Sequence, residues 1–388
     1  MNMSKELKKD WLPKLQERYA RRNREGKTRM IDELCADYHY ERKYAIKLLS
    51  GGLPAAAGNA HPGPERRYDE IESLVKYIWL KAEQPCGKRL VPILRQWLPY
   101  YERRYERLSR GHRKLVGQIS AATLDRLLAP ARASQVGRGR CGTKPGSLLR
   151  SEIPIRTGTR DLSRPGYLEA HSVAHCGTSL AGSFIWSLTY TDILSGWTEG
   201  GAVWNKGAAG VLGATREVEE RLPFALLGFD SDNGGEFINH HLRSYMRERQ
   251  AAVDFTRSRP YHSDDNAHVE QKNWTWARQL LGYDRLEDPE LVAPISALYR
   301  EVWAPWQNFF LPCLKLKEKW RQGSHWRKRY ELPRTAYHRL CAPGMLALKQ
   351  RRALRDRYEG LDPFALKDEL ETRLKHILKP KSSGVNLA

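Results

Sequence analysis

The sequence predicts a multidomain protein of class α + α/β. A mixed-sheet core of order β-β-β-α-β-α-β-α is flanked by helical domains and by a small basic β-rich module. Three observations lead to this prediction. The chain has 388 residues, more than most single domains contain. Helical periodicity dominates residues 1–130, and strand-like alternation begins after Gly166. Basic residues are concentrated at the two ends, so the ends differ from the centre in composition as well as in pattern.

The charge distribution points to a polyanionic partner. The formal net charge is +21. Residues 1–150 carry 32 basic and 16 acidic residues, residues 151–310 carry 15 and 21, and residues 311–388 carry 19 and 8. Lys and Arg neutralise phosphates and release counterions, so two basic arms around an acidic centre favour a protein that binds nucleic acid.

Cysteine usage and hydropathy exclude several other classes. The six cysteines are scattered, with no C-x-x-C pair and no zinc-finger spacing. Neither a structural zinc nor a disulfide framework is therefore expected. No run of 18 apolar residues and no apolar segment of the signal-peptide type occurs. We expect a cytoplasmic protein with reduced thiols and no membrane partner.

Residues 1–50 read as three short helices. Lys5 to Asn23 carries an apolar stripe at four-residue spacing, Gly26 is expected to break the chain, and Lys27 to Tyr38 forms the second helix. The third helix, Glu41 to Leu49, is basic. This pattern matches a helix-turn-helix, with a generic helical bundle as the alternative. The predicted DNA contacts are Arg42, Lys43 and Lys47.

A linker rich in Gly, Ala and Pro, residues 51–67, leads to a second helical domain of the helix-turn-helix kind, residues 68–130. Its last helix, Ser120 to Leu128, begins with a plausible N-cap and would contact DNA through Arg126. Residues 131–160 read as a basic linker that could lie along a DNA groove. The predicted contacts there are Arg138 and Arg140.

Residues 161–310 read as the mixed-sheet core. Three strand-like runs suggest an antiparallel meander, and helices then alternate with two further strands. The expected elements are strands Tyr167 to Cys176, Phe184 to Ile193, Trp197 to Trp204, Phe224 to Phe229 and Ala252 to Thr256, and helices Ala208 to Arg221, Phe237 to Arg249, Asn266 to Leu281 and Glu290 to Phe310.

The C-terminal part is predicted to hold two units. Residues 311–345 mix basic and aromatic side chains and read as a small β-rich module. Residues 346–388 read as a C-terminal helix, Pro363 to Leu378, and a tail. The DNA contacts predicted in the module are Arg327, Lys328 and Arg329.

Two acids in the core have the placement of a metal site. Asp232 follows a strand and precedes Asn-Gly-Gly, and Glu270 lies on a predicted helix, with 37 residues between the two. Carboxylates on a strand end and on a later helix are what a two-metal phosphoryl-transfer site needs. Lys272, on the same helix, could contact a phosphate, although a solvated helix charge explains it equally well.

These residues resemble a known family. The segments GFDSDNGGEF (Gly228 to Phe237) and NAHVEQKNW (Asn266 to Trp274), after three strands, resemble the RNase H-like core of retroviral integrases and DDE transposases. The whole chain resembles a bacterial insertion-sequence transposase. The resemblance implies Asp232 and Glu270 as catalytic metal ligands for two Mg²⁺ or Mn²⁺ ions. It implies double-stranded DNA, both element ends and target, as the partner, and a homo-oligomer on that DNA.

The chain departs from this family at the first acid. The matching strand reads GYLEAHSVAHCG, so His171 occupies the position of the expected Asp. Imidazole is a poor ligand for a hard cation. Glu169, two residues earlier on the same strand face, and Asp192, on the second strand, are alternative acids. The role favoured for Asp192 is a structural hydrogen bond at the end of the strand. A zinc site built on His171, His175 and the neighbouring cysteine is a weak alternative.

Three functions follow as hypotheses. The first is a DNA transposase that cleaves and joins DNA by two-metal transesterification. The second is a catalytically impaired relative that still binds element ends, because His171 replaces the first acid. The third is a metal-dependent nuclease with the same core and no strand transfer.

Overall fold

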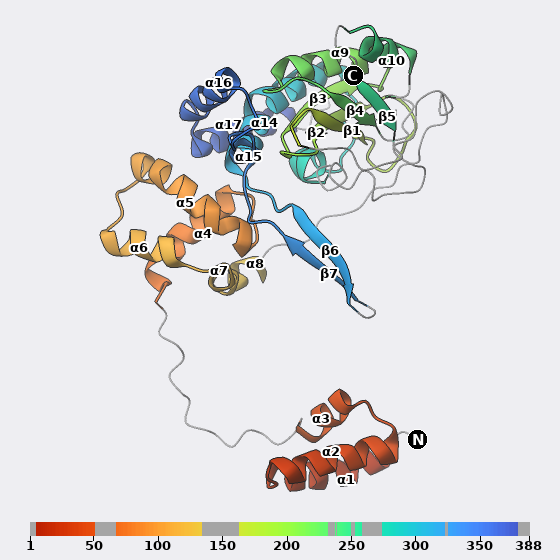
Figure 1. Cartoon of the computed structure of the whole chain (residues 1–388), viewed down its shortest axis with the longest axis vertical. Helices are drawn as coiled ribbons and strands as arrows, with labels where there is room; N and C mark the ends of the chain where they lie inside the picture. Colours follow the sequence, from red (N-terminus) through yellow and green to blue (C-terminus); the bar gives the residue numbers. More distant parts are fainter. Residues whose placement is uncertain are drawn as a thin grey trace, which may run out of the picture. The chain divides into compact units, whose positions relative to one another are not determined.

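The computed structural model describes residues 5–50, 67–133, 163–231, 237, 239–249, 253–257, 274–322 and 325–378. The chain divides into two compact units, Met1–Arg67 and Tyr68–Ala388. Figure 1 shows the elements of each unit in sequence colours.

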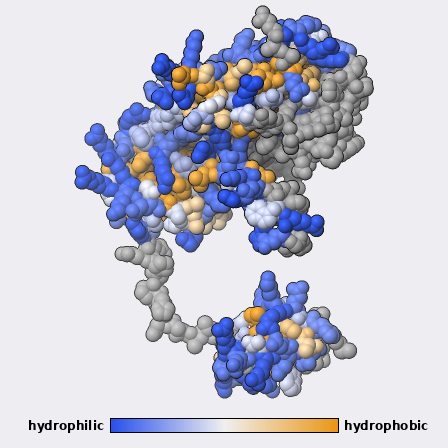
Figure 2. All heavy atoms as spheres, in the orientation of Figure 1, coloured by the Kyte–Doolittle hydropathy of each residue, from blue (hydrophilic) through white to orange (hydrophobic). Residues whose placement is uncertain are grey.

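The N-terminal unit is a three-helix domain. Its helices are α1 (Lys5–Ala20), α2 (Arg24–Tyr38) and α3 (Arg42–Ser50). The predicted break at Gly26 is wrong, because the Asn23 side chain accepts a hydrogen bond from the Gly26 amide at 2.9 Å and starts α2 earlier. In the space-filling view this unit has a largely hydrophilic surface with a few hydrophobic patches (Figure 2). The core shared by α2 and α3 consists of Met30, Ile31, Leu34, Tyr40, Ala45 and Leu49.

The second unit begins with a helical domain of five α-helices after a 3₁₀ turn (Asp69–Ile71). They are α4 (Glu72–Lys81), α5 (Gly87–Arg104), α6 (Arg110–Gln118), α7 (Ala121–Leu127) and α8 (Ala129–Ala133). The predicted cap at Ser120 is confirmed by its hydrogen bond from the Thr123 amide. Helix α6 was not predicted, and it begins where Ser109 caps the His112 amide.

A five-stranded mixed sheet forms the core, with strand order β3-β2-β1-β4-β5. The strands are β1 (Tyr167–Ala174), β2 (Ile185–Asp192), β3 (Thr198–Trp204), β4 (Gly228–Ser231) and β5 (Asp254–Arg257). The predicted antiparallel meander is confirmed, because β1 pairs antiparallel with β2 and β2 with β3. Strands β1, β4 and β5 run parallel.

Helices cover both faces of the sheet. Helices α9 (Ala208–Arg221) and α10 (His240–Arg247) follow on the face where Tyr190 shares a hydrogen bond of 2.9 Å with Thr215. The other face and the β3 edge receive later helical segments. These are a π-helical turn (Trp274–Arg278), α12 (Gln279–Leu281), a 3₁₀ turn (Pro289–Leu291), α13 (Val292–Leu298), a second π-helical turn (Tyr299–Trp303) and α14 (Ala304–Phe310).

The open edge of β3 is closed by side chains from these segments. The Asn308 side-chain amide both accepts from the Thr198 amide at 2.9 Å and donates to the Thr198 carbonyl at 2.7 Å. Ser296 accepts a hydrogen bond from the Ala202 amide at 3.0 Å. An edge strand that is covered in this way cannot pair with another chain.

The C-terminal part contains one hairpin and three helices. They are β6 (Leu316–Gln322), β7 (His325–Tyr330), α15 (Ala336–Leu340), α16 (Leu348–Glu359) and α17 (Pro363–Ile377). The predicted β-rich module is therefore a hairpin followed by a short helix, because Thr335 caps the His338 amide and starts α15. The predicted final helix is confirmed by α17.

Candidate functional site

The parallel strands β1 and β4 position one predicted site residue, His171, at the end of their described ladder. Their parallel register pairs Tyr167 with Gly228 and ends at the pair Ala170 and Ser231. His171 is the residue after Ala170, and it is half-buried. Asp232 and Glu270 lie outside the described residues, as do Arg138, Arg140 and Lys272.

His171 belongs to a row of residues that crosses the sheet. It pairs with Thr189 of β2, which in turn pairs with Gly200 of β3. Paired residues of neighbouring strands point to the same face. A Cβ at Gly200 would lie 2.5 Å from the indole nitrogen of Trp276. Trp276 therefore packs on the face that also carries His171, and it follows Glu270 by six residues.

The neighbouring row is polar and buried throughout. Glu169 pairs with Asp230 of β4 and with Thr191 of β2, and both carboxylates are at most 1% exposed. Thr256 of β5 donates a hydrogen bond to Asp230 at 2.8 Å, and the Thr191 hydroxyl lies 3.1 Å from that of Thr198. Glu169 was expected as an alternative acid on this face, but the rest of the row was not predicted, although alternate polar residues in SLTYT of β2 signalled a polar face.

Asp192 does not belong to this face. It pairs with Leu168, which points into the main core on the other side of the sheet. Its carboxylate accepts hydrogen bonds from the Gly166 amide at 2.8 Å and from the Ser195 amide at 2.7 Å. The favoured structural role for Asp192 is confirmed. Burial raises the pKa of this carboxyl group, against the lowering effect of those hydrogen bonds.

His175 is a structural residue. It is fully buried, and its Nε2 lies 2.7 Å from the Ser187 hydroxyl, which also accepts a hydrogen bond from Tyr299 at 2.8 Å. Burial and the nearby Arg278 lower the pKa of His175 to about 3, so the ring is neutral. Within the part of the chain that the structure describes, no group of three or more His, Cys, Asp or Glu could hold a metal ion. The zinc site therefore gains no support.

A pair of Mg²⁺ ions is what the family resemblance implies at the predicted acidic positions. Such a pair needs carboxylate oxygens from both strands, because hard cations prefer oxygen ligands. Position 171 supplies an imidazole nitrogen, and the described carboxylates of Glu169 and Asp230 sit in the buried row beside it. His171 therefore does not supply the oxygen ligand that the second of two ions would need.

The described DNA-contact candidates all lie on exposed surface. In α3 the exposed Lys43 and Lys47 flank Tyr44 and Ile46, which are 43% and 39% exposed. An exposed tyrosine and isoleucine between lysines is unusual for a solvated helix and suits a binding face. Four other candidates have partners within the chain, namely Arg42 with Asp32, Arg126 with Thr123, Arg327 with Gln322 and Arg329 with Glu318.

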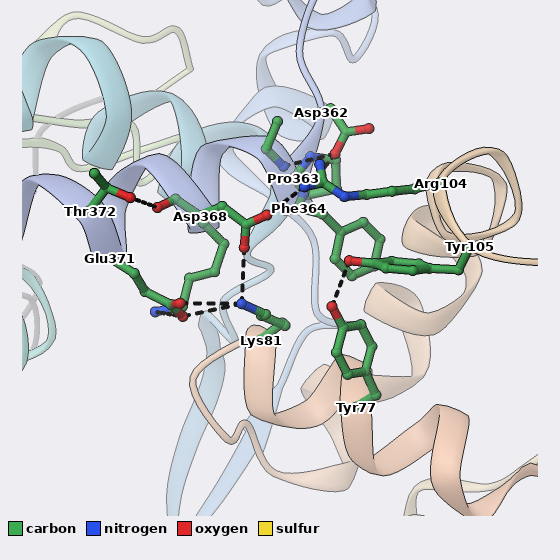
Figure 3. A network of polar contacts seen from close by, with 12 residues as sticks. Tyr77, Lys81, Arg104, Tyr105, Asp362, Pro363, Phe364, Asp368, Glu371 and Thr372 are labelled. Atoms are coloured by element: carbon green, nitrogen blue, oxygen red, sulfur yellow. Dashed lines mark hydrogen bonds and ion pairs between the residues drawn. The ribbon is translucent and has the colours of Figure 1, made fainter.

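Helix α17 fastens the α4–α8 domain to the core (Figure 3). The Lys81 ammonium of α4 lies 3.0 Å from Asp368 and 3.2 Å from Glu371, both on α17. Arg104 of α5 pairs with the same Asp368 at 2.5 Å. Desolvation lowers the pKa of Lys81, but the hydrogen bonds to the two carboxylates outweigh it and raise the pKa.

An aromatic cluster completes this junction. The Phe364 ring of α17 lies 5.2 Å from Trp97, 5.8 Å from Tyr105 and 6.1 Å from Tyr77, measured between ring centroids. Tyr77 and Tyr105 share a hydrogen bond of 2.6 Å. Aromatic pairs of this geometry contribute stability beyond that of the buried area alone. The helical domain that carries α7 is therefore packed as part of the second unit.

Comparison with known proteins places the chain in a family. It is 38% identical over 323 residues to the uncharacterized protein y4rM of Sinorhizobium fredii, covering 82% of this chain and 90% of the relative. The chain belongs to the y4rM family. No model of a described protein family matches this y4rM-family chain.

Two solved structures resemble parts of this y4rM-family member. One is the catalytic core domain of BIV integrase, at 18% identity and a TM-score of 0.25, covering 35% of this chain and 84% of that one. The other is a simian T-cell lymphotropic virus intasome, at 13% identity and a TM-score of 0.26, covering 47% and 59%. Among the described helices, none is long and apolar enough to cross a membrane.

Proposed function

We propose that this chain is a DNA transposase, which binds the ends of a mobile element and catalyses cleavage and strand transfer. The observation that carries the proposal is the parallel register of β1 and β4. The pair Ala170 and Ser231 ends the described ladder, and one further pair would set His171 beside Asp232. Two positions that are 61 residues apart in sequence would then share one end of the sheet.

The third position is supported by packing. Trp276 covers Gly200 in the row that contains His171. Glu270 precedes Trp276 by six residues, and we propose that the segment leading to Trp276 brings the Glu270 carboxylate to the face that carries His171. This arrangement is the reason for preferring a nucleic-acid transferase over a binding protein that merely shares the sheet.

The reaction we propose is in-line displacement at a phosphodiester. An oxygen of water or of a DNA 3′-hydroxyl forms a new bond to phosphorus, and the bond to the leaving oxygen breaks. Asp232 and Glu270 suit one divalent ion, Mg²⁺ or Mn²⁺, which would stabilise charge on the phosphate oxygens when bound. Because His171 does not suit a second ion, no step is assigned to an ion pair.

The DNA contacts are assigned to the basic arms. Lys43 and Lys47 on α3 and Arg126 on α7 are exposed on helices that could enter a groove. The net charge of +21 supplies the attraction to phosphate. Binding of two element ends, and hence an oligomer on DNA, is part of the same proposal.

The test is a strand-transfer assay with labelled duplexes from the DNA that flanks the reading frame. We would compare the unaltered chain, His171→Asp and His171→Asp/Asp232→Asn in Mg²⁺. Joined products from the unaltered chain as well as from His171→Asp, lost in the double variant, support the proposal. DNA binding without cleavage or joining by any of the proteins would refute it, and cleavage without joining would favour a nuclease.

A second candidate function is favoured by His171 itself. An imidazole in place of the first acid suits a chain that binds element ends without joining them. In that case the unaltered chain binds the duplex but gives no product, whereas His171→Asp gives both cleaved and joined DNA. Equal activity of the two proteins would exclude this candidate.

A further inference from the structure

The hairpin β6–β7 is a two-stranded sheet of its own, paired with no other described strand. Figure 1 shows it extending away from the helices at its root. Three large apolar side chains on it are 45–47% exposed, namely Leu316, Trp320 and Tyr330. An isolated two-stranded hairpin is marginally stable in water. A hairpin that stays exposed on both faces is therefore expected to have a partner that covers it.

The root of the hairpin is held firmly, so its direction is fixed. Cys313 and Arg334 form a backbone bridge below the two strands. Arg339 of α15 donates to the carbonyl oxygens of both residues, at 3.0 Å each. The half-buried Lys315 ammonium donates to the carbonyls of Ile193 and Leu194, just after β2. The hairpin thus projects from the sheet core as a rigid extension.

The two faces of the hairpin differ in charge. The register pairs Lys319 with Lys328 and Arg321 with Trp326, so Arg321 and Lys328 lie on one face, here called the cationic face. The described side chains on this face include two basic groups and no acidic one. The opposite face holds two arginines and an acid, in the pairs Glu318 with Arg329 and Trp320 with Arg327.

The side chains of the opposite face are also partnered within the hairpin. Arg329 forms an ion pair with Glu318 at 3.3 Å, and Arg327 donates to Gln322 at 3.1 Å. Lys328 has no ion-pair partner among the described residues, and it is exposed. Donors that are already used inside the hairpin are less able to bind phosphate than the ammonium of Lys328.

Charge decides what covers the cationic face. From Leu316 to Tyr330 the sequence contains six basic residues and one acidic residue. A second copy of the hairpin would bring like charges together, which is unfavourable. Duplex DNA supplies opposite charge, and its major groove, about 12 Å wide, admits a two-stranded β-ribbon. Seven residues of β6 span about 23 Å at about 3.3 Å each, roughly two thirds of a DNA turn.

We propose that the β6–β7 hairpin enters the major groove of duplex DNA with its cationic face, Arg321 and Lys328 included, toward the phosphates. This inference rests on the proposed DNA function and sharpens it. Of the three neighbouring basic residues 327–329, Lys328 contacts DNA, whereas Arg327 and Arg329 point away from it.

The test compares Lys328→Gln with Arg329→Gln in the full chain, on the same duplex. Each variant removes one positive charge from an exposed side chain. A difference in DNA affinity between them therefore comes from the face on which the residue lies and not from the net charge. Loss of one phosphate contact reduces the magnitude of the slope of log K against log salt concentration by about 0.9. If the affinities of the variant and the unaltered chain are equal at 1 M salt, the variant binds about eightfold more weakly at 0.1 M salt. We expect this loss for Lys328→Gln and almost none for Arg329→Gln.

The outcomes separate this inference from the proposed function. Equal losses in the two variants, a larger loss for Arg329→Gln, or no loss in either would overturn the assignment of the cationic face while DNA binding itself stands. Absence of duplex binding by the unaltered chain would overturn the proposed function as well. Thermal unfolding of each variant, expected to match that of the unaltered chain, shows that the hairpin is intact.

Discussion

Ala170 of β1 pairs with Ser231 of β4, and this pair is the last of the described parallel ladder. Ala170 is 1% exposed and Ser231 is fully buried. The residues that follow them are His171 and Asp232, which the sequence motifs had assigned to the first and second acidic positions of one site. The proposed site requires that these two strands remain in this register beyond the described pair.

Gly200→Ala should disturb the site face without touching a proposed ligand. The new Cβ would meet the indole nitrogen of Trp276 at 2.5 Å, so the tryptophan or the strand must move. Overpacking of this kind costs about 1–3 kcal/mol of unfolding free energy. Urea unfolding followed by tryptophan fluorescence measures the change.

The matched control for that substitution is Gly213→Ala on α9. Nothing lies within 4 Å of a Cβ at Gly213, and alanine favours helix over glycine by about 0.5–1 kcal/mol. The control should therefore be neutral or slightly more stable than the unaltered chain. Equal destabilisation of the two variants would count against the packing of Trp276 on Gly200.

Lys81 and Asp368 should be energetically coupled, although 287 positions separate them in sequence. The Lys81 side chain is only 20% exposed and also contacts Glu371, whereas Asp368 also contacts Arg104. A double-mutant cycle with Lys81→Met and Asp368→Asn should show a coupling of about 1 kcal/mol. If the effects of the two substitutions on the unfolding free energy add to within about 0.3 kcal/mol, this ion pair does not stabilise the packing of the helical domain on α17.

His175 should make the protein sensitive to acid. Burial and then Arg278 lower its pKa from 6.5 to about 3 in the folded state. Between these two values the unfolded chain binds the extra proton, so folding stability from this residue is complete above pH 6.5 and is lost as pH falls toward 3. The slope is about 1.4 kcal/mol per pH unit in that window.

The measurement is the urea midpoint from pH 7 to pH 5 for the unaltered chain and for His175→Gln. Glutamine is neutral and can still hydrogen-bond Ser187, so its profile should be flatter. Parallel profiles would show that His175 does not titrate on unfolding.

Much of the secondary structure could be predicted, because it is encoded by local periodicity. Helix α9, Ala208–Arg221, has the bounds that its sequence predicts. Helix α6 was missed because RGHRKLVGQ is mostly polar, although Ser109 is a recognisable cap. The break predicted at Gly26 was wrong because the hydrogen bond from the Gly26 amide to the Asn23 side chain stabilises the first turn of α2 more than one glycine destabilises it.

Of the three predicted catalytic positions, the structure describes His171, whereas Asp232 and Glu270 lie outside the described residues. The motifs singled out His171, and β1 carries it in the expected strand. The contact of Trp276 with Gly200 and the burial of Glu169 beside Asp230 have no local signal, because they depend on strand order and register. Register is set by the folded sheet, and a shift of one residue moves every side chain to the other face.

The most direct test of the central claim is a thiol cross-link between positions 171 and 232. Neighbouring strands lie about 4.8 Å apart, which is within the Cα separation of about 4.4–6.8 Å that a disulfide accepts. Oxidised His171→Cys/Asp232→Cys should give the linked peptide by mass spectrometry. The control His171→Cys/Ser231→Cys, whose second thiol points to the opposite face, should not. Linkage in the control, or in neither protein, would contradict the placement of Asp232 beside His171.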